Sequence, residues 1–489
     1  MLLGIDIGTT HTKVGVYDRL GKTLAHKQAL TPREMSLEGL EHFPAEELWR
    51  VAAGLIRKAV LESGSEVEAL AVSSMGESGV PLDAEGQPTY PIIPWNDDRS
   101  LEELHRLERA LPADRWFATT GLIPSHIYTL TKWLWLRQHA PEAWERTRVW
   151  LSSMGYIRFK LTGEALMTDT QAARTMAFDV RRGVWSEELL QLAGLDGDFL
   201  PPTVAGTQAA GQVLPEVAEQ TGLRAGTPVF AGGHDHFCAA LACGTLTPEA
   251  VLDSHGTAEA LTLGLASPPD PSRAGGFATG PHVIPGHSYL EGGIRSSGGS
   301  LHWAKGVLGF ESFEAMHQAA AGIDPNTSPL FIANLTGTSP PFNEPEANAA
   351  FVDVKRDHTA AHFARAVYEG IAFELRRCFE ALEPLASEPI RLVRMAGGSA
   401  RDPMWSEIRA AVLGRPLEVA LNPDMVTLGA ALLAGIGAGV YQSPEEAFTL
   451  TYRSQTTIRP DPRLQEIYQA PYGRYRKTVE ALRISREES

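Results

Sequence analysis

The sequence predicts an α/β protein made of two related domains that face each other across a cleft. The main observation is a repeat, because a Gly-Thr turn between two short strands occurs at Gly8 and again at Gly256. The two copies lie 256 − 8 = 248 residues apart in a chain of 489, and repetition at half the length indicates a duplicated domain. Short apolar strands and amphipathic helices fill the sequence around them, as in α/β proteins. The hydrophobic content of 43% is that of a globular protein with a large core.

The first copy of the repeat begins at the N-terminus, where apolar residues on both sides of Gly8 predict two strands. Asp6, at the end of the first strand, can hold a hydrated Mg²⁺, because hard cations take carboxylate and water oxygens. The backbone N–H groups and hydroxyls of Gly8, Thr9 and Thr10 can bind phosphate oxygens, and Lys13 can add a point charge. An ordinary hairpin with an exposed aspartate is the alternative interpretation.

The elements that follow are predicted from the spacing of apolar residues. Residues 20–31 predict a third strand, 44–62 an amphipathic helix and 67–74 a further strand. In the second half, 361–382 predicts a long helix. Residues 427–435 predict a helix of small side chains that suits tight packing.

The cluster 95–99, Trp-Asn-Asp-Asp-Arg, is a candidate sugar-binding segment. Sugars are bound by an aromatic face against C–H groups and by planar polar groups against hydroxyls. The alternative is the polar start of a helix, with Ser100 as the N-cap of a helix from Leu101.

A second candidate is the segment 232–236, Gly-Gly-His-Asp-His, between a strand at 227–231 and an apolar helix. The glycines allow close approach of a ligand, and Asp235 stands at a strand-to-helix junction, where a reactive carboxylate would face a cleft. The alternative is that Asp235 caps the helix. His234 and His236 have no third metal ligand spaced near them, which argues against a metal pair.

The second copy of the repeat spans residues 250–263, with an apolar strand, Asp253, a Gly256-Thr257 turn and an alternating strand. Two such hairpins on facing domains would offer two phosphate-binding turns to one nucleotide. The segment 4–10, Gly-Ile-Asp-Ile-Gly-Thr-Thr, closely resembles the first phosphate loop of the actin-like ATPases. This resemblance implies two ribonuclease-H-like domains around a central cleft, expected at 1–245 and 246–489.

Composition excludes several classes of partner. The formal net charge of 43 − 59 = −16 argues against nucleic acid and against an anionic membrane surface. No apolar run reaches the ~20 residues that span a bilayer, and the first residues predict a strand and no signal peptide. Cys238, Cys243 and Cys378 form neither a disulfide framework nor a zinc site, so we expect them to be buried. A cytoplasmic protein is therefore expected.

Nine stretches resemble, in order and spacing, the FGGY family of carbohydrate kinases over nearly the whole chain. They are GIDIGTTHTK (4–13), PWNDDRS (94–100), TLTKWLWLRQH (129–139), KLTGE (160–164), AARTMAFD (172–179), GGHDH (232–236), SHGTAE (254–259), AGGSARDPMW (396–405) and TLGAALLAG (427–435). The resemblance implies an enzyme that phosphorylates a hydroxyl of a small sugar, ketose or polyol, with ATP and Mg²⁺.

The resemblance also implies a role for each matching residue. Asp235 is the expected general base, and Asp6 and Asp235 are the expected residues of the Mg²⁺ site. The expected nucleotide-binding residues are Thr9, Thr10, His11, Lys13, Gly256, Thr257, Gly298, His302, Gly397, Gly398 and Asp402. The expected sugar-binding residues are Glu77, Trp95, Asn96 and His236.

Departures from the family pattern limit the choice of substrate. Gly76 stands where glycerol kinases carry Arg, and 74–76 is Ser-Met-Gly where xylulokinases usually have Gln-Met-His. Glycerol is therefore not the expected substrate, and the sequence does not decide which sugar is phosphorylated. It also leaves the oligomeric state open, and a homodimer is among the states that it allows.

A chaperone-like or actin-like ATPase would share both hairpins but would not need residues 95–97 or 233–235. A catalytically silent sugar-binding regulator is a further alternative, which intact candidate residues at both sites disfavour.

Overall fold

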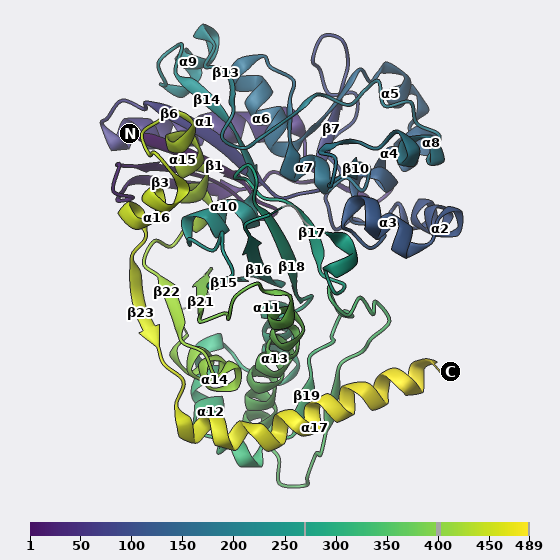
Figure 1. Cartoon of the computed structure of the whole chain (residues 1–489), viewed down its shortest axis with the longest axis vertical. Helices are drawn as coiled ribbons and strands as arrows, with labels where there is room; N and C mark the ends of the chain where they lie inside the picture. Colours follow the sequence, from purple (N-terminus) through teal and green to yellow (C-terminus); the bar gives the residue numbers. More distant parts are fainter. Residues whose placement is uncertain (268–269, 398–401, 488–489) are drawn as a thin grey trace.

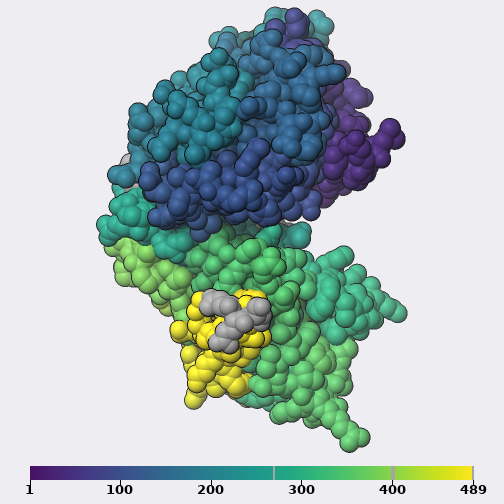
Figure 2. Space-filling model, turned by 90° about the vertical axis from the view of Figure 1, so that its right-hand side faces the viewer, coloured from purple at the N-terminus to yellow at the C-terminus, as the bar shows by residue number. Residues whose placement is uncertain are grey.

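The computed structural model describes residues 1–267, 270–397 and 402–487 (Figure 1). Two mixed β-sheets form its framework, one in the upper and one in the lower part of Figure 1. The space-filling view shows the N-terminal half in one lobe and most of the C-terminal half in the other, with a constriction between them (Figure 2).

The first sheet has six strands in the order β13-β14-β6-β1-β2-β3. The antiparallel hairpin β1–β2 places Asp6 opposite Lys13, while β1, β6 and β14 run parallel. Their carboxyl ends therefore lie at one edge, where Glu77 follows β6 and Asp235 follows β14. The bounds are β1 (Leu2–Ile7), β2 (His11–Tyr17), β3 (Thr23–Leu30), β6 (Ala69–Ser74), β13 (Ala209–Gln212) and β14 (Pro228–His234).

The second sheet has seven strands in the order β17-β18-β16-β15-β21-β22-β23. Its hairpin β15–β16 is antiparallel, and β15, β21 and β22 run parallel. It thus repeats the pairing of β1, β2, β6 and β14, which confirms the predicted fold of two ribonuclease-H-like domains. The bounds are β15 (Ala250–His255), β16 (Glu259–Leu265), β17 (Ala278–Pro281), β18 (Ser288–Ile294), β21 (Leu392–Ala396), β22 (Leu417–Ala420) and β23 (Ser454–Ile458).

Two helices of small residues pack beside the first sheet in the upper part of Figure 1: α10 (Asp235–Ala242) and α15 (Met425–Gly437). α15 belongs to the C-terminal half of the chain but packs on β1, so the boundary expected near residue 245 stays a prediction. A Cβ on Gly4 would lie 1.8 Å from the carbonyl oxygen of Thr427, and one on Gly429 would lie 1.9 Å from that of Cys238. The tight packing that the small residues predict is thus confirmed.

The helices predicted at 44–62 and 361–382 are confirmed as α1 (Ala45–Ser63) and α13 (Ala360–Leu382). The other helices are α2 (Leu101–Ala110), α3 (Ala113–Thr120), α4 (Thr129–His139), α5 (Pro141–Arg146), α6 (Ser153–Thr162), α7 (Asp169–Ala173), α8 (Glu187–Leu192), α9 (Pro215–Thr221), α11 (Gly298–Val307), α12 (Phe313–Ala321), α14 (Pro403–Leu413), α16 (Pro444–Thr451) and α17 (Pro462–Glu487). Short 3₁₀ turns span Pro271–Arg273, Pro325–Thr327 and Glu383–Leu385.

Short two-stranded ribbons complete the fold. They are β4 (Glu34–Met35) with β5 (Glu41–His42), β7 (Gly79–Leu82) with β8 (Val149–Ser152), β9 (Met167–Thr168) with β12 (Thr203–Val204), β10 (Phe178–Asp179) with β11 (Val184–Trp185), and β19 (Leu330–Ile332) with β20 (Ala350–Val352). The three cysteines are free and buried, as expected. Within the part of the chain that the structure describes, no helix is both long and apolar enough to cross a membrane.

The contact between α15 and α10 makes a stability prediction. Gly429→Ala should destabilise the fold by about 1–3 kcal/mol, because the added methyl group has no room beside Cys238. Gly54→Ala in α1 is the matched control, since nothing lies within 4 Å of a Cβ there. That control should gain up to about 1 kcal/mol from helix propensity. Melting temperatures from calorimetry test both; an unchanged value for Gly429→Ala would contradict the close packing.

Candidate active site

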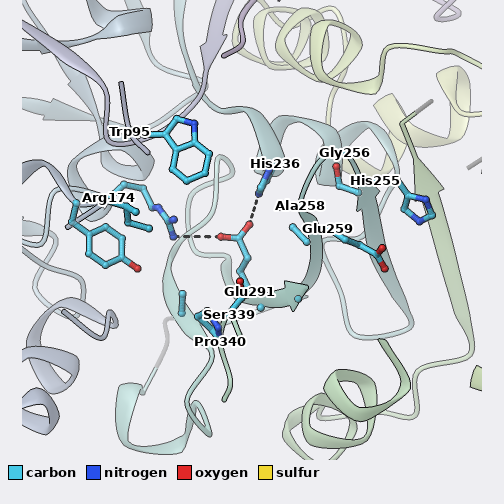
Figure 3. Close-up of a pocket in the computed structure, with 17 residues that line it drawn as sticks. Trp95, Arg174, His236, His255, Gly256, Ala258, Glu259, Glu291, Ser339 and Pro340 are labelled. Carbon is cyan, nitrogen blue, oxygen red and sulfur yellow. Dashed lines mark hydrogen bonds and ion pairs between the residues drawn. The ribbon is translucent and has the colours of Figure 1, made fainter. Parts of the chain in front are cut away.

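A cavity of about 270 Å³ lies between the two lobes (Figure 3). The N-terminal half contributes Trp95, Ile127, Tyr128, Arg174 and His236, and the C-terminal half contributes Ser254, His255, Gly256, Ala258, Glu259, Ala260, Ala278, Glu291, Gly292, Gly293, Ser339 and Pro340. Such a volume, with charged side chains converging on an apolar wall, suits a small polar molecule.

Asp235 lies where β14 ends and α10 begins, as the sequence predicts. The N-cap position belongs to His234, which argues against the alternative that Asp235 is the cap. The Oδ1 atom of Asp235 lies 2.8 Å from Nδ1 of His234 and accepts a 2.7 Å hydrogen bond from the backbone N–H of His236. One fifth of the Asp235 side chain is exposed, so its carboxylate can reach a ligand.

Charged neighbours set the protonation of this segment. Burial alone would raise the pKa of Asp235, but the imidazoles of His234 and His236 outweigh burial and hold that pKa below its ordinary value. Burial lowers the pKa of His236, whereas Asp235 and Glu291 act more strongly and raise it to about 9. An ionised carboxylate therefore stands beside an imidazolium at neutral pH.

Arg174 joins the two halves of the chain at the cavity. Its Nε donates to Oε1 of Glu77 at 2.7 Å, and its Nη1 lies 3.4 Å from Oε2 of Glu291. The other carboxylate oxygen of Glu291 lies 2.6 Å from Nδ1 of His236 (Figure 3). Glu77, which the sequence places in the sugar site, thus connects to His236 through two residues that received no role in advance. Two sequence signals could have identified these residues. Arg174 lies within the motif 172–179, and Glu291 is an acid in a buried strand, where a charged residue indicates a function.

Asp6 and Lys13 meet across the first hairpin, as their register requires. The Nζ atom of Lys13 lies 3.4 Å from Asp6 and 3.6 Å from Asp424, the residue before α15. Burial, with help from Asp424 and Asp235, raises the pKa of Asp6 to about 7 against the opposing effect of Lys13. Oδ1 of Asp6 is buried and has no hydrogen-bond partner among the described residues. A partnerless carboxylate oxygen near two further acids fits a hard cation such as Mg²⁺.

Thr9, on the turn of the first hairpin, is held from three sides. Its Oγ1 accepts a 2.9 Å hydrogen bond from Nε1 of Trp95 and lies 3.4 Å from the sulfur of Met75. Nη2 of Arg33 donates to its carbonyl oxygen at 2.7 Å. Thr10 beside it is exposed, and His11 is half-buried.

The second turn, Gly256-Thr257, is exposed and rests on the start of α11. The carbonyl oxygen of Thr257 accepts 3.0 Å hydrogen bonds from the backbone N–H groups of Ser297 and Gly299. A Cβ on Gly298 would lie 2.4 Å from the carbonyl oxygen of Gly256. A Cβ on Gly397, whose φ is +105°, would lie 2.2 Å from that of His255. Of the predicted nucleotide-binding glycines, Gly298 therefore packs against this turn and Gly397 packs against His255, the residue before it.

The acids of the two hairpins have different surroundings. Asp6 stands two residues before its turn glycine, Gly8, whereas Asp253 stands three residues before Gly256. Because successive side chains of a strand point to opposite faces, the two acids point to opposite faces of their strands. Nη1 of Arg409 lies 2.9 Å from Oδ2 of Asp253, from Nε2 of His255 and from Oε1 of Glu259. The guanidinium occupies the centre of this group and argues against a metal ion there.

Asp402, His302 and Asn96 are not among the described residues that line the cavity. Asp402 caps α14 and lies 2.6 Å from Nδ1 of His317, while His302 is exposed on α11. Gly398 lies outside the described residues. Asn96 is exposed, and no hydrogen bond of its side chain is seen within the described ranges. At the alternative helix cap, the hydroxyl of Ser100 lies 2.9 Å from that of Thr131, and no side-chain cap bond forms in α2.

Comparison with known proteins agrees with this arrangement. Residues 1–242 match the N-terminal domain, and residues 248–438 the C-terminal domain, of the FGGY family of carbohydrate kinases. The xylulose kinase of Escherichia coli K12 is 30% identical over 490 residues, covering 99% of each chain. That of Lactococcus lactis is 29% identical over 493 residues, covering 98% of this chain and 97% of its own. The structure of ligand-bound xylulose kinase from Lactobacillus acidophilus has a TM-score of 0.91 at 23% identity and covers 98% of each chain.

Since the two family models together match most of its length, the chain belongs to the FGGY family of carbohydrate kinases and is an ATP-dependent sugar kinase.

Proposed function

We propose that this enzyme transfers the γ-phosphoryl group of ATP to a hydroxyl group of a small ketose, with Asp235 as the general base. The observation that carries this proposal is the place of the Asp235 carboxylate. It adjoins His236 at the cavity on one side and interacts electrostatically with Asp6 and Lys13 on the other. The relatives named xylulose kinase support a ketose, because xylulose is a five-carbon ketose.

The cavity supplies the contacts that a neutral sugar needs. The face of Trp95 suits the C–H groups of a sugar, and the carboxylate of Glu291 can accept hydrogen bonds from its hydroxyls. Arg174 and His236 can donate hydrogen bonds to oxygen atoms of the substrate. Both cations already have a carboxylate partner, however, so a negatively charged sugar acid would find no free positive charge among the described residues that line the cavity.

The chemistry follows from the ionised state of Asp235. Its carboxylate takes the proton of the attacking hydroxyl as that oxygen forms a bond to the γ-phosphorus and the bond to the β-phosphate oxygen breaks, releasing ADP. The turns at Gly8-Thr9-Thr10 and Gly256-Thr257 offer N–H groups and hydroxyls to the phosphates. Asp6 would hold Mg²⁺, which neutralises negative charge on the phosphates when it is bound.

A substrate panel tests the proposed class. ADP release is measured with D-xylulose, D-ribulose, glycerol and D-gluconate at equal concentrations. We expect kcat/KM for one of the ketopentoses to exceed that for glycerol or gluconate by at least about tenfold, because the pocket bonds more of its hydroxyls. If glycerol or gluconate is the best substrate, the ketose assignment is wrong.

Replacing Asp235 tests the general base. Asp235→Asn keeps the size of the side chain but cannot accept the proton, so kcat should fall about 10²–10⁴-fold with little change in ATP affinity. Asp324→Asn is the control, because the exposed Asp324 also accepts a backbone hydrogen bond at a helix start. Its donor, Asn326, is not a cavity-lining residue, whereas His236, the donor to Asp235, is. Retention of more than about a tenth of the wild-type kcat would remove Asp235 from this role.

Glu291→Gln tests the charge network of the cavity. The change keeps the shape of the side chain but removes the negative charge that pairs with His236 and Arg174. We expect the KM for the sugar to rise about 10–100-fold, the usual cost of losing a charged hydrogen bond, while the KM for ATP stays nearly constant. Equal rises in both values would indicate a general loss of structure instead of a sugar contact.

A further inference from the structure

Trp95 connects the cavity to the first phosphate turn. Its ring lines the cavity (Figure 3), while its indole N–H donates a 2.9 Å hydrogen bond to the hydroxyl of Thr9. The two residues are 86 positions apart in the chain, so this contact exists only in the folded protein. One side chain therefore touches both places where the two substrates are expected.

The backbone of Trp95 is anchored by a lysine in the protein interior. Lys132 has 0% of its surface exposed, and its ammonium donates to the carbonyl oxygens of Trp95 at 3.2 Å, His126 at 3.1 Å and Ile127 at 2.6 Å. All three N–H donors of the ammonium are thus used. Lys132 therefore fixes the backbone of Trp95 relative to His126 and Ile127, and the orientation of the indole depends on its own contacts, of which the bond to Thr9 is one.

The hydroxyl of Thr9 is prepared for a second partner. It accepts the indole N–H, so its own proton must point elsewhere, and its neighbour there is the sulfur of Met75 at 3.4 Å. A thioether is a weak acceptor, which a phosphate oxygen can readily replace. Arg33 holds the carbonyl oxygen of Thr9 and keeps the turn in place during such an exchange.

We propose that Trp95 is a positioning residue that couples sugar binding to nucleotide binding through Thr9. A sugar stacked on the indole fixes the ring, and the chain from N–H to hydroxyl to phosphate oxygen then gains strength along its length, because each hydrogen bond polarises the next. Coupling is reciprocal, so bound nucleotide must tighten sugar binding by the same factor. This inference rests on the proposed function and adds to it a link between the two sites.

The test measures the affinity for D-xylulose by calorimetry, with and without Mg²⁺ and a non-hydrolysable ATP analogue. In the wild-type enzyme the nucleotide should tighten sugar binding at least about 5-fold, the lower end of usual coupling. Trp95→Phe keeps an aromatic face but lacks the N–H group, so the factor should fall below about twofold. Trp185→Phe is the matched control, because its indole donates a 3.0 Å bond to Pro201 outside the cavity lining. That control should keep the wild-type factor.

Substitutions at Thr9 test the same bond from the other side and do not depend on how Trp95→Phe folds. Thr9→Val removes the acceptor and should abolish the coupling, whereas Thr9→Ser keeps the hydroxyl and should retain it. Trp95→Phe combined with Thr9→Val should lower the coupling no further than either change alone.

The inference is overturned if wild type shows no coupling, or if Trp95→Phe weakens sugar binding while the factor stays unchanged. Failure of the proposed function gives a different result, namely wild-type enzyme that releases no ADP with any ketose.

Discussion

The contact of α15 with β1 and α10 determines where the charged groups of the cleft lie. Gly4 and Gly429 let three backbone segments approach to distances that no side chain would permit. α10 begins with Asp235 and α15 begins directly after Asp424, so the same contact brings both acids near Lys13 and Asp6. A methyl group at Gly4 would push α15 away from β1, and one at Gly429 would push α15 away from α10, so the acids would be displaced as well. The hydroxyl of Tyr17, 2.7 Å from that of Thr427, ties the first hairpin to the same helix.

Alternating charges let the protein bury many ionised groups in one place. A series of charged side chains begins at Asp235 and runs through His236, Glu291 and Arg174 to Glu77. Each member lies beside a group of opposite charge. Buried charges are tolerated when they are paired and hydrogen-bonded, and removing one partner leaves an uncompensated charge. The cluster around Asp6 differs, since Asp6 and Asp424 share the ammonium of Lys13, with His26 beside Asp424. Asp235, which is itself paired with His236, adds a further negative charge near them. A cluster with that excess of negative charge suits a bound cation, in agreement with the proposed role of Asp6.

Much of the fold could be predicted from the sequence, because its signals are local. Each signal lies within one element: the turn at Gly8, the apolar periodicity of α1 and α13, and the small residues of α15. The position of Asp235 at a strand end was predicted for the same reason.

The ion pairs of the site were not predictable in this way. Arg174 meets Glu77 across 97 residues and Glu291 across 117, and no local pattern specifies either partner. The repeated strand-turn-strand motif alone also predicts that Asp253 is equivalent to Asp6. In the structure Asp253 stands one residue farther from its turn glycine than Asp6 does, so its side chain points toward Arg409.

That offset has a consequence for the symmetry of the cleft. Duplication of a domain produces two similar backbones facing each other, and a cleft lined equally on both sides would accept an elongated ligand in either direction. Here Asp6 and Asp424 stand beside the partly exposed ammonium of Lys13, while Asp253 is paired with a fully buried guanidinium. The two sides therefore differ in the charged groups that a ligand can reach, although their strands follow the same path. A molecule whose charge is concentrated at one end meets a cleft with a defined polarity, so the duplicated fold distinguishes head from tail.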